Sequence, residues 1–236
     1  MRSIQQIVDA QAKRWQVERQ AETERHGAPT GPEPIRPWIT IAREYGSGGT
    51  AVGEAIAARL GFQFYDRAIL DAIAQESKYR REFVESVDER RRSAIEAHVE
   101  ALLHGESFAR SDFLRYLTHV LLTIGKTGHA VILGREAHLI LPAQEGLSVR
   151  IVAPFAQRVA TVADRLGLSP EDAAEQVRSV DRQRAEFRKV HFHLDAWRTD
   201  DYDLVLNMAR TSSAGAVALI QTAFFARFPE ADTTEA

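Results

Sequence analysis

The sequence predicts an α/β protein in which helices cover both faces of a parallel sheet. Short runs of β-forming residues alternate with helical segments along most of the chain, a pattern typical of parallel sheets. One connection between a strand and a helix, "YGSGGT" at residues 45–50, is rich in glycine. The chain has 236 residues, 44% of them hydrophobic, which is enough for one sizeable domain with small appendages.

The first 26 residues predict a helix that is separate from the main domain. Ile4, Ile7, Val8 and Trp15 recur at helical spacing. The segment "HGAPTGPEPIRP" follows and is read as a linker, so residues 1–37 form an appendage. We expect the helix to dock on the body or on a second subunit, because its apolar residues would otherwise face water. The alternative is a poorly ordered arm.

The main domain begins at Trp38 with "WITIA", a short run of β-forming residues. A helix is predicted over residues 50–60, where Val52, Ile56 and Leu60 lie on one stripe. "FQFYD" (62–66) is the second predicted strand. Residues 68–76 and roughly 82–126 are mostly helical, which makes a long helical segment before the next strand.

The second half of the main domain repeats the alternation. "HAVILGR" (129–135), "LSVRIVA" (147–153) and "YDLVLNM" (202–208) are the remaining predicted strands. Helices are predicted over 155–166, from Ser169 to about residue 187, and over 213–227. Ser169 is the expected N-cap, followed by two acidic residues in the first turn.

Composition narrows the range of functions. The formal net charge of −3 gives no reason to expect a nucleic-acid partner or an anionic membrane surface. The absence of cysteine excludes disulfides and thiolate metal sites. No run of 18 or more apolar residues is present, and the N-terminus does not resemble a secretory signal. We therefore expect a cytoplasmic protein without membrane or nucleic-acid partners.

The glycine-rich turn has the properties of a phosphate-binding loop. Gly46, Ser47, Gly48 and Gly49 follow a predicted strand and open a predicted helix. At such a position backbone N–H groups and the helix dipole attract an anion, and glycine lets the backbone approach it closely. The alternative is that the glycines merely make a tight connection.

The turn matches the motif G-x-x-x-x-G-K-[ST] only in part. Gly48 takes the place of the second glycine, and Thr50 takes the place of the residue whose hydroxyl would face Mg²⁺. Arg43 stands at the first glycine and Gly49 at the lysine.

Three further stretches accompany the turn: "FYDRAIL" (64–70), "VILGREAHLILP" (131–142) and the arginine-rich "VRSVDRQRAEFRKVHFH" (177–193). In this order they resemble the cytidylate kinases, and most of all the cytidylate kinase-like group of the P-loop nucleoside monophosphate kinases. The resemblance covers about residues 38–221, leaving residues 222–236 as a helix end and tail. It implies a P-loop kinase fold with a five-stranded parallel sheet, a helical monophosphate-binding insertion (about 66–127) and an arginine-rich lid (about 178–193).

The resemblance also implies an activity and residue roles. The activity is transfer of the γ-phosphoryl group of ATP, with Mg²⁺, to a small nucleotide, CMP or dCMP. Residues 46–50 would hold the ATP phosphates. The acceptor would be bound by Asp66, Arg67, Arg135, Asp181 and Arg188, and the lid would supply Arg182 and Arg184 to catalysis, with Arg178 as a neighbour.

The sequence departs from the family at three positions. Gly49 replaces the lysine, Ala51 replaces the threonine that holds Mg²⁺, and Leu133 replaces an acidic residue before the glycine-arginine pair. Our hypothesis is that Arg43 takes over the charge of the lysine and is catalytic, because both changes occur in one turn. Arg158 and Arg165 are expected to be surface helix residues.

Two other functions stay open. The chain could phosphorylate a different small acceptor, because a fold does not determine function. It could also be a regulatory module that binds a nucleotide without catalysis, as a homodimer built through the N-terminal helix.

Overall fold

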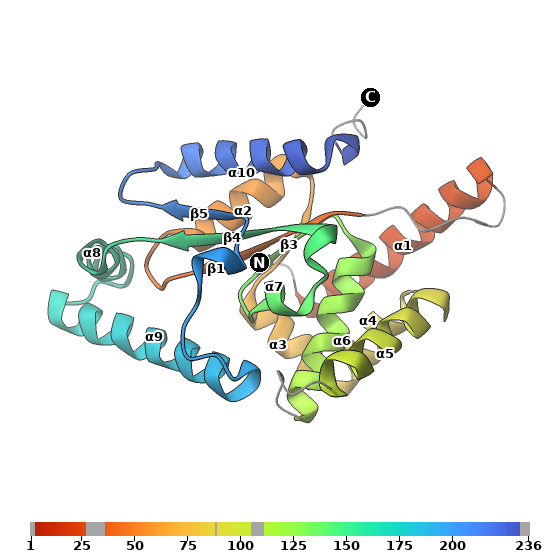
Figure 1. Ribbon diagram of the computed structural model, residues 1–236, viewed down its shortest axis with the longest axis horizontal. Coiled ribbons are helices and arrows are strands. Elements are labelled where there is room, and N and C mark those ends of the chain that lie inside the picture. The colour runs from red at the N-terminus through yellow and green to blue at the C-terminus, as the bar shows by residue number, and fades with distance from the viewer. Residues whose placement is uncertain (1–2, 27–35, 88, 105–110, 232–236) are drawn as a thin grey trace.

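The computed structural model describes residues 3–26, 36–87, 89–104 and 111–231. It confirms the predicted fold class: five strands form one parallel sheet in the order β2-β3-β1-β4-β5 (Figure 1). The strands are β1 (Trp38–Arg43), β2 (Gln63–Tyr65), β3 (Ala130–Leu133), β4 (Gly146–Val152) and β5 (Leu204–Asn207).

Helices cover both faces of the sheet. The α-helices are α1 (Ile4–His26), α2 (Gly49–Leu60), α3 (Arg67–Gln75), α4 (Ser77–Glu85), α5 (Glu89–His104), α6 (Asp112–Thr127), α7 (Ala137–Ile140), α8 (Phe155–Leu166), α9 (Pro170–Phe192) and α10 (Ser213–Arg227). Two 3₁₀ turns are η1 (Ala143–Glu145) and η2 (Thr199–Asp201). In Figure 1, α2 and α10 lie above the sheet, and α3, α6, α7 and α9 lie below it.

Side-chain alternation along β1 and β4 assigns each residue to one of these faces. Ile39 and Ile41 of β1 pack with α2 and α10 in a fully buried cluster, as does Val149 of β4. The residues between them point to the opposite face. Arg150 pairs with Ala42 in the ladder, so this arginine lies on the face that α2 and α10 do not cover.

The helix boundaries follow recognisable capping chemistry. Ser169 accepts a hydrogen bond from the backbone N–H of Asp172 and caps α9, as predicted. Asp66 caps α3 by accepting from Ile69 N at 2.8 Å. Helix α9 extends to Phe192, about one turn beyond the predicted end, where His193 adopts a left-handed conformation. Helix α10 continues past residue 221 and buries Phe224 completely.

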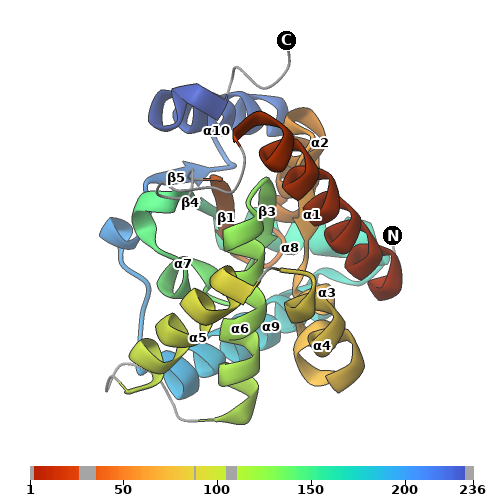
Figure 2. The same cartoon turned by 90° about the vertical axis from the view of Figure 1, so that its right-hand side faces the viewer.

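Helices α3 to α6 lie between β2 and β3, in the segment where the insertion is expected. Helix α1 packs against α4 and α3 of this insertion (Figure 2). Ile7 and Val8 are 1% and 3% exposed and join the core that contains α3 and α6. The helix therefore docks on its own chain. The side chain of Trp15 and most of the linker lie outside the described residues, and the homodimer stays a prediction.

No described helix is both long enough and apolar enough to cross a membrane.

Candidate active site

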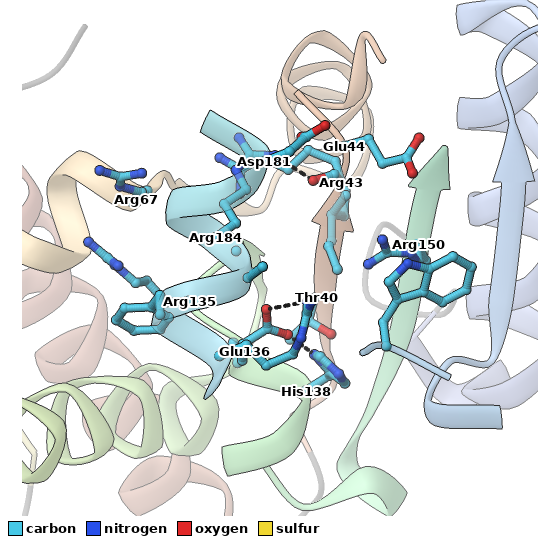
Figure 3. A pocket seen from close by; sticks show the side chains of 18 of the residues that line it. Thr40, Arg43, Glu44, Arg67, Arg135, Glu136, His138, Arg150, Asp181 and Arg184 are labelled. Atoms are coloured by element: carbon cyan, nitrogen blue, oxygen red, sulfur yellow. Dashed lines mark hydrogen bonds and ion pairs between the residues drawn. The ribbon is translucent and has the colours of Figure 1, made fainter. Parts of the chain in front are cut away.

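A pocket of about 310 Å³ opens beside the carboxyl end of β1, between the sheet and α9 (Figure 3). Its lining contains six arginines and three carboxylates, which leaves an excess of positive charge. The arginines are Arg43, Arg67, Arg135, Arg150, Arg184 and Arg188, and the carboxylates are Glu44, Glu136 and Asp181. Such an excess in a concave site favours a ligand that carries several negative charges.

The glycine-rich loop next to the pocket has the geometry of an anion cradle. Gly46 and Gly48 both have φ of +82°, which glycine adopts without strain. Gly48 is the N-cap of α2, and no side chain caps the first turn of this helix. The N–H groups of that turn can therefore donate to a ligand, and the residues fit the phosphates of ATP.

Arg43 reaches the pocket through a space that two glycines leave open. A Cβ at position 49 would lie 2.7 Å from Arg43 Cβ. At position 134 a Cβ would collide with Arg43 Nη1. The absence of a side chain at position 49, where the motif has its lysine, thus makes room for the arginine.

The positive charge of Arg43 is destabilised by its surroundings. Burial lowers the pKa of its guanidinium to about 9, and the positive charges of Arg184 and Arg67 act in the same direction. Arg43 Nε is buried and has no hydrogen-bond partner among the described residues. The group still carries its charge at neutral pH, and an anion in the pocket would relieve the repulsion.

The turn after β3 presents Arg135 and Glu136 to the pocket. Gly134, Arg135 and Glu136 have φ of +85°, +55° and +49°. Two consecutive non-glycine residues in the left-handed region are uncommon and typically mark a functional site. Arg135 donates from Nε to Asp71 Oδ1 at 2.5 Å and from Nη2 to Asp71 Oδ2.

Glu136 is a largely buried carboxylate with unused hydrogen-bonding capacity. Its oxygens lie 3.5 Å from Arg188 Nη1 and 3.8 Å from His138 Nδ1. Both contacts exceed a good hydrogen bond. Burial raises the pKa of Glu136, while Arg188 and Arg150 act in the opposite direction. Burial also lowers the pKa of His138 to about 4, so this imidazole is neutral at pH 7.

Arg150 lies at the end of the pocket opposite Arg67 and Arg135 (Figure 3). The arginine is 6% exposed, and its guanidinium carbon lies 3.8 Å from the ring centre of Trp197. Its Nη1 donates to the Tyr202 hydroxyl at 3.4 Å. Within the part of the chain that the structure describes, its buried Nε has no hydrogen-bond partner and no carboxylate forms an ion pair with it. A buried donor without a partner is costly, so a ligand that offers a hydrogen-bond acceptor to Arg150 would be stabilised here.

Two arginines connect helix α9 to the end of β1 and to the glycine-rich loop that follows it. Arg184 Nη1 donates to the Arg43 carbonyl at 2.5 Å. Arg158 Nη1 donates to Asp181 Oδ2 at 2.6 Å and to the Tyr45 carbonyl at 3.3 Å. The predicted surface location of Arg158 is therefore wrong: it is 7% exposed, because α8 begins beneath the loop and turns this residue inward. Arg165 stays near the surface and donates to the Tyr45 hydroxyl.

The structure does not bring every predicted site residue into the pocket. Arg67, Arg135, Asp181, Arg184 and Arg188 line it, as does Arg43. Asp66 is occupied as the cap of α3. Arg182 is exposed, because a residue two positions from Arg184 points to nearly the opposite side of a helix. Arg178 is exposed as well.

Thr50 is exposed in the first turn of α2, where its hydroxyl can face a ligand on the loop. Two of the three carboxylates of the pocket are already engaged: Glu44 with Ala153 N and Arg158, and Asp181 with Arg158. The described residues contain no group of three acidic or histidine side chains that could hold a metal. Mg²⁺ would fit here only as a companion of nucleotide phosphates.

Sequence reasoning missed Glu136, His138, Arg150 and Trp197. One signal was present for Arg150, because a charge inside a buried strand is rare unless it faces a cleft. Nothing in the sequence indicated that Trp197, in the segment after α9, would stack on it.

The chain is similar to several known proteins. The sequence model of the "Cytidylate kinase-like family" matches residues 38–210. A cytidylate kinase of Ignicoccus hospitalis is 28% identical over 189 residues, which cover 78% of this chain and 95% of that protein. A uronate isomerase of Corynebacterium glutamicum is 32% identical over 122 residues, which cover 51% of this chain. This chain spans only about a quarter of that relative, 23% of its length.

A solved structure of an uncharacterized protein from Eubacterium ventriosum shares the fold. Its TM-score is 0.61 at 20% identity, and the match covers 79% of this chain and 97% of that one.

Proposed function

This chain belongs to the cytidylate kinase-like family, and on that premise we propose that it is a nucleotide kinase that transfers the γ-phosphoryl group of ATP to CMP or dCMP. The observation that carries the proposal is the convergence of six arginines on one pocket beside a glycine-rich loop. Phosphoryl transfer requires mainly positioning and positive charge around an anionic transition state. Arginine suits this task, because its planar fork grips phosphate oxygens bidentately.

The two phosphate groups would be held by different elements. The N–H groups at the start of α2 would bind the ATP phosphates, and Mg²⁺, when bound, would neutralise part of their charge. Arg67 and Arg135 would bind the acceptor phosphate from the insertion side of the pocket. Arg43 and Arg184 would contribute positive charge between the two, where the phosphoryl group passes.

Arg43 would supply the positive charge that the lysine of the motif supplies. Its guanidinium lies next to Gly134 and enters the pocket from the strand that precedes the loop. We infer that the charge is conserved while the element that supplies it has changed, with Gly49 as the necessary companion of Arg43.

Glu136 and Arg150 support a cytosine acceptor. Glu136 can only accept hydrogen bonds when ionised, and Arg150 can only donate them. Cytosine has a ring edge with an amino group beside a ring nitrogen and a carbonyl. The amino group could donate to Glu136, and the ring nitrogen and carbonyl could accept from Arg150. A second phosphate would satisfy Arg150 but would be repelled by Glu136. Uracil would present a carbonyl where cytosine presents its amino group.

The test is to incubate the full chain with ATP and Mg²⁺ and one acceptor at a time, among CMP, dCMP, UMP, AMP and GMP. Products are separated by chromatography. We expect a diphosphate from CMP or dCMP and little from the other three. Product from a different nucleotide would refute the cytosine assignment. ATP binding without product from any acceptor would favour another acceptor or a regulatory module.

A further inference from the structure

The guanidinium of Arg135 is held along one edge by a residue that the proposed chemistry does not use. Asp71 accepts from Nε at 2.5 Å and from Nη2, in a bidentate contact between the turn after β3 and helix α3. The side chains of Arg135 and Asp71 are 12% and 19% exposed, so this contact is screened from solvent. A charge-assisted pair of this geometry fixes orientation as well as distance.

Asp71 lies behind Arg135 as seen from the pocket. Arg135 lines the pocket and Asp71 does not. The bidentate contact occupies the Nε edge of the guanidinium, and no other acceptor among the described residues bonds the group. Its outer edge, formed by Nη1 and the remaining hydrogen of Nη2, is therefore left for a ligand. That edge matches two oxygens of a phosphate.

Two aromatic rings lie close to the same guanidinium. Its central carbon lies 4.4 Å from the ring centre of Phe187 on α9 and 5.7 Å from that of Phe113 on α6. These cation–π contacts restrict the movement of the guanidinium, and the bidentate contact with Asp71 restricts its rotation. Arg135 is thus oriented jointly by the insertion and by α9.

Asp71 also reduces the repulsion between two arginines. Arg67 Nε lies 3.7 Å from Asp71 Oδ2, the same oxygen that accepts from Arg135. Figure 3 shows Arg67 and Arg135 at the same end of the pocket. Without the carboxylate, the two positive charges would be driven apart.

We propose that Asp71 is a positioning residue for phosphate binding: it holds the Nε edge of Arg135 so that the outer edge faces the acceptor phosphate. The proposal rests on the proposed function for the identity of the ligand, but not for its chemistry, which is that of a phosphate group. Because Asp71 lies on α3, it also makes the phosphate site depend on the position of the insertion.

The test compares ligands with and without a phosphate on the Asp71→Asn variant, which keeps the shape and removes the charge. Titration calorimetry measures CMP, cytidine and ATP on the full chain. We expect the affinity for CMP to fall about tenfold, as for a weakened charged contact. Cytidine and ATP should bind as in the wild type. Asp71→Glu should recover part of the loss, and Asp164→Asn, at an exposed position of α8, serves as control.

Two results would overturn the proposal. An equal loss for CMP and cytidine would mean that Asp71 only supports the fold. Tighter binding of CMP would mean that Asp71 occupies Arg135 in competition with phosphate.

Inorganic phosphate separates this proposal from the proposed function. If the wild type binds no nucleoside monophosphate, the proposed function fails, and the same comparison is made with phosphate alone. A weaker phosphate affinity in Asp71→Asn would then still support the role of Asp71, and an unchanged affinity would refute it. A wild type that binds neither CMP nor phosphate contradicts both proposals.

Discussion

At the scale of single residues, the lysine-less loop is explained by three positions that depend on one another. Arg43 passes between Gly49 and Gly134, and a side chain at either glycine would occupy its path. The motif comparison showed that the lysine is absent and that an arginine is nearby. It could not show that Gly49 is required by the arginine, because this follows only from the packing of β1 against the loop.

Gly134→Ala should displace Arg43 and weaken ATP binding. The new Cβ would collide with Arg43 Nη1, in a backbone conformation with φ of +85°. Gly61→Ala is the matched control, since Gly61 is also left-handed but a Cβ there would meet no atom within 4 Å. Both variants should lose roughly 1–2 kcal/mol of unfolding free energy from backbone strain. In calorimetry, only Gly134→Ala should bind ATP more weakly than the wild type. If Gly134→Ala and Gly61→Ala bound ATP with equal affinity, the proposed role of Arg43 in ATP binding would be contradicted.

Glu136→Gln should lower the selectivity for CMP over UMP. The amide can donate a hydrogen bond where the carboxylate only accepts, so a uracil carbonyl becomes acceptable. We expect the ratio of kcat/KM for CMP and UMP to fall by about tenfold or more, corresponding to one buried hydrogen bond. Glu175→Gln, exposed on α9, is the control. An unchanged ratio would remove Glu136 from base recognition.

His138 should make the protein less stable in mild acid. Burial lowers its pKa to about 4 in the folded state, whereas an unfolded histidine titrates near 6.5. Between these values the unfolded chain binds more protons, so the unfolding free energy falls as pH falls. From pH 6.5 to 5 the loss due to His138 is roughly 1–2 kcal/mol.

Urea unfolding at pH 6.5 and pH 5 measures this effect. His138→Gln should show a smaller decrease than the wild type, and His98→Gln on α5 should behave like the wild type. If the unfolding free energy of His138→Gln decreased as much as that of the wild type, His138 would not be the source of the acid sensitivity.

At the scale of elements, the sequence predicted those helices and helix ends that depend on local patterns. Ser169 and the acidic residues after it predicted the start of α9, and apolar stripes predicted α2. The prediction that Arg158 lies on the surface was wrong, because its burial is not determined by a local pattern. Its burial depends on Asp181 and the Tyr45 carbonyl, which are far away in the sequence. Helical periodicity within α8 carries no information about such partners.

Helix α1 contributes to stability through its contact with the insertion. Ile7→Ala should cost roughly 2–4 kcal/mol of unfolding free energy, because Ile7 is 1% exposed against the core around α3 and α4. Val17→Ala on the same helix should cost less than about 0.5 kcal/mol, because Val17 is 59% exposed. Chemical denaturation distinguishes the two, and equal costs would mean that α1 does not dock in solution.

At the scale of the whole molecule, the order of strands and helices was sufficient to predict the parallel sheet. Motifs on β1, β3 and α9 predicted Arg43, Arg135 and Arg184, which line the pocket. They did not predict the other end of the pocket, because Arg150 and Trp197 meet only when β4 and the segment after α9 come together. The sequence therefore indicated residues that we propose for phosphate binding, but not those that we propose for binding the base.

We propose that the loop supports phosphoryl transfer without a lysine because Arg43 supplies the positive charge. The most direct measurement is the turnover of ATP and CMP by the wild type and by Arg43→Gln, with ATP affinity measured in parallel. We predict diphosphate formation by the wild type and a loss of about 10²–10³ in kcat in the variant, as for other groups that stabilise transition-state charge. Arg59→Gln, exposed in the last turn of α2, should leave turnover unchanged. Full activity of Arg43→Gln, or a wild type that binds ATP without any turnover, would contradict this role of Arg43.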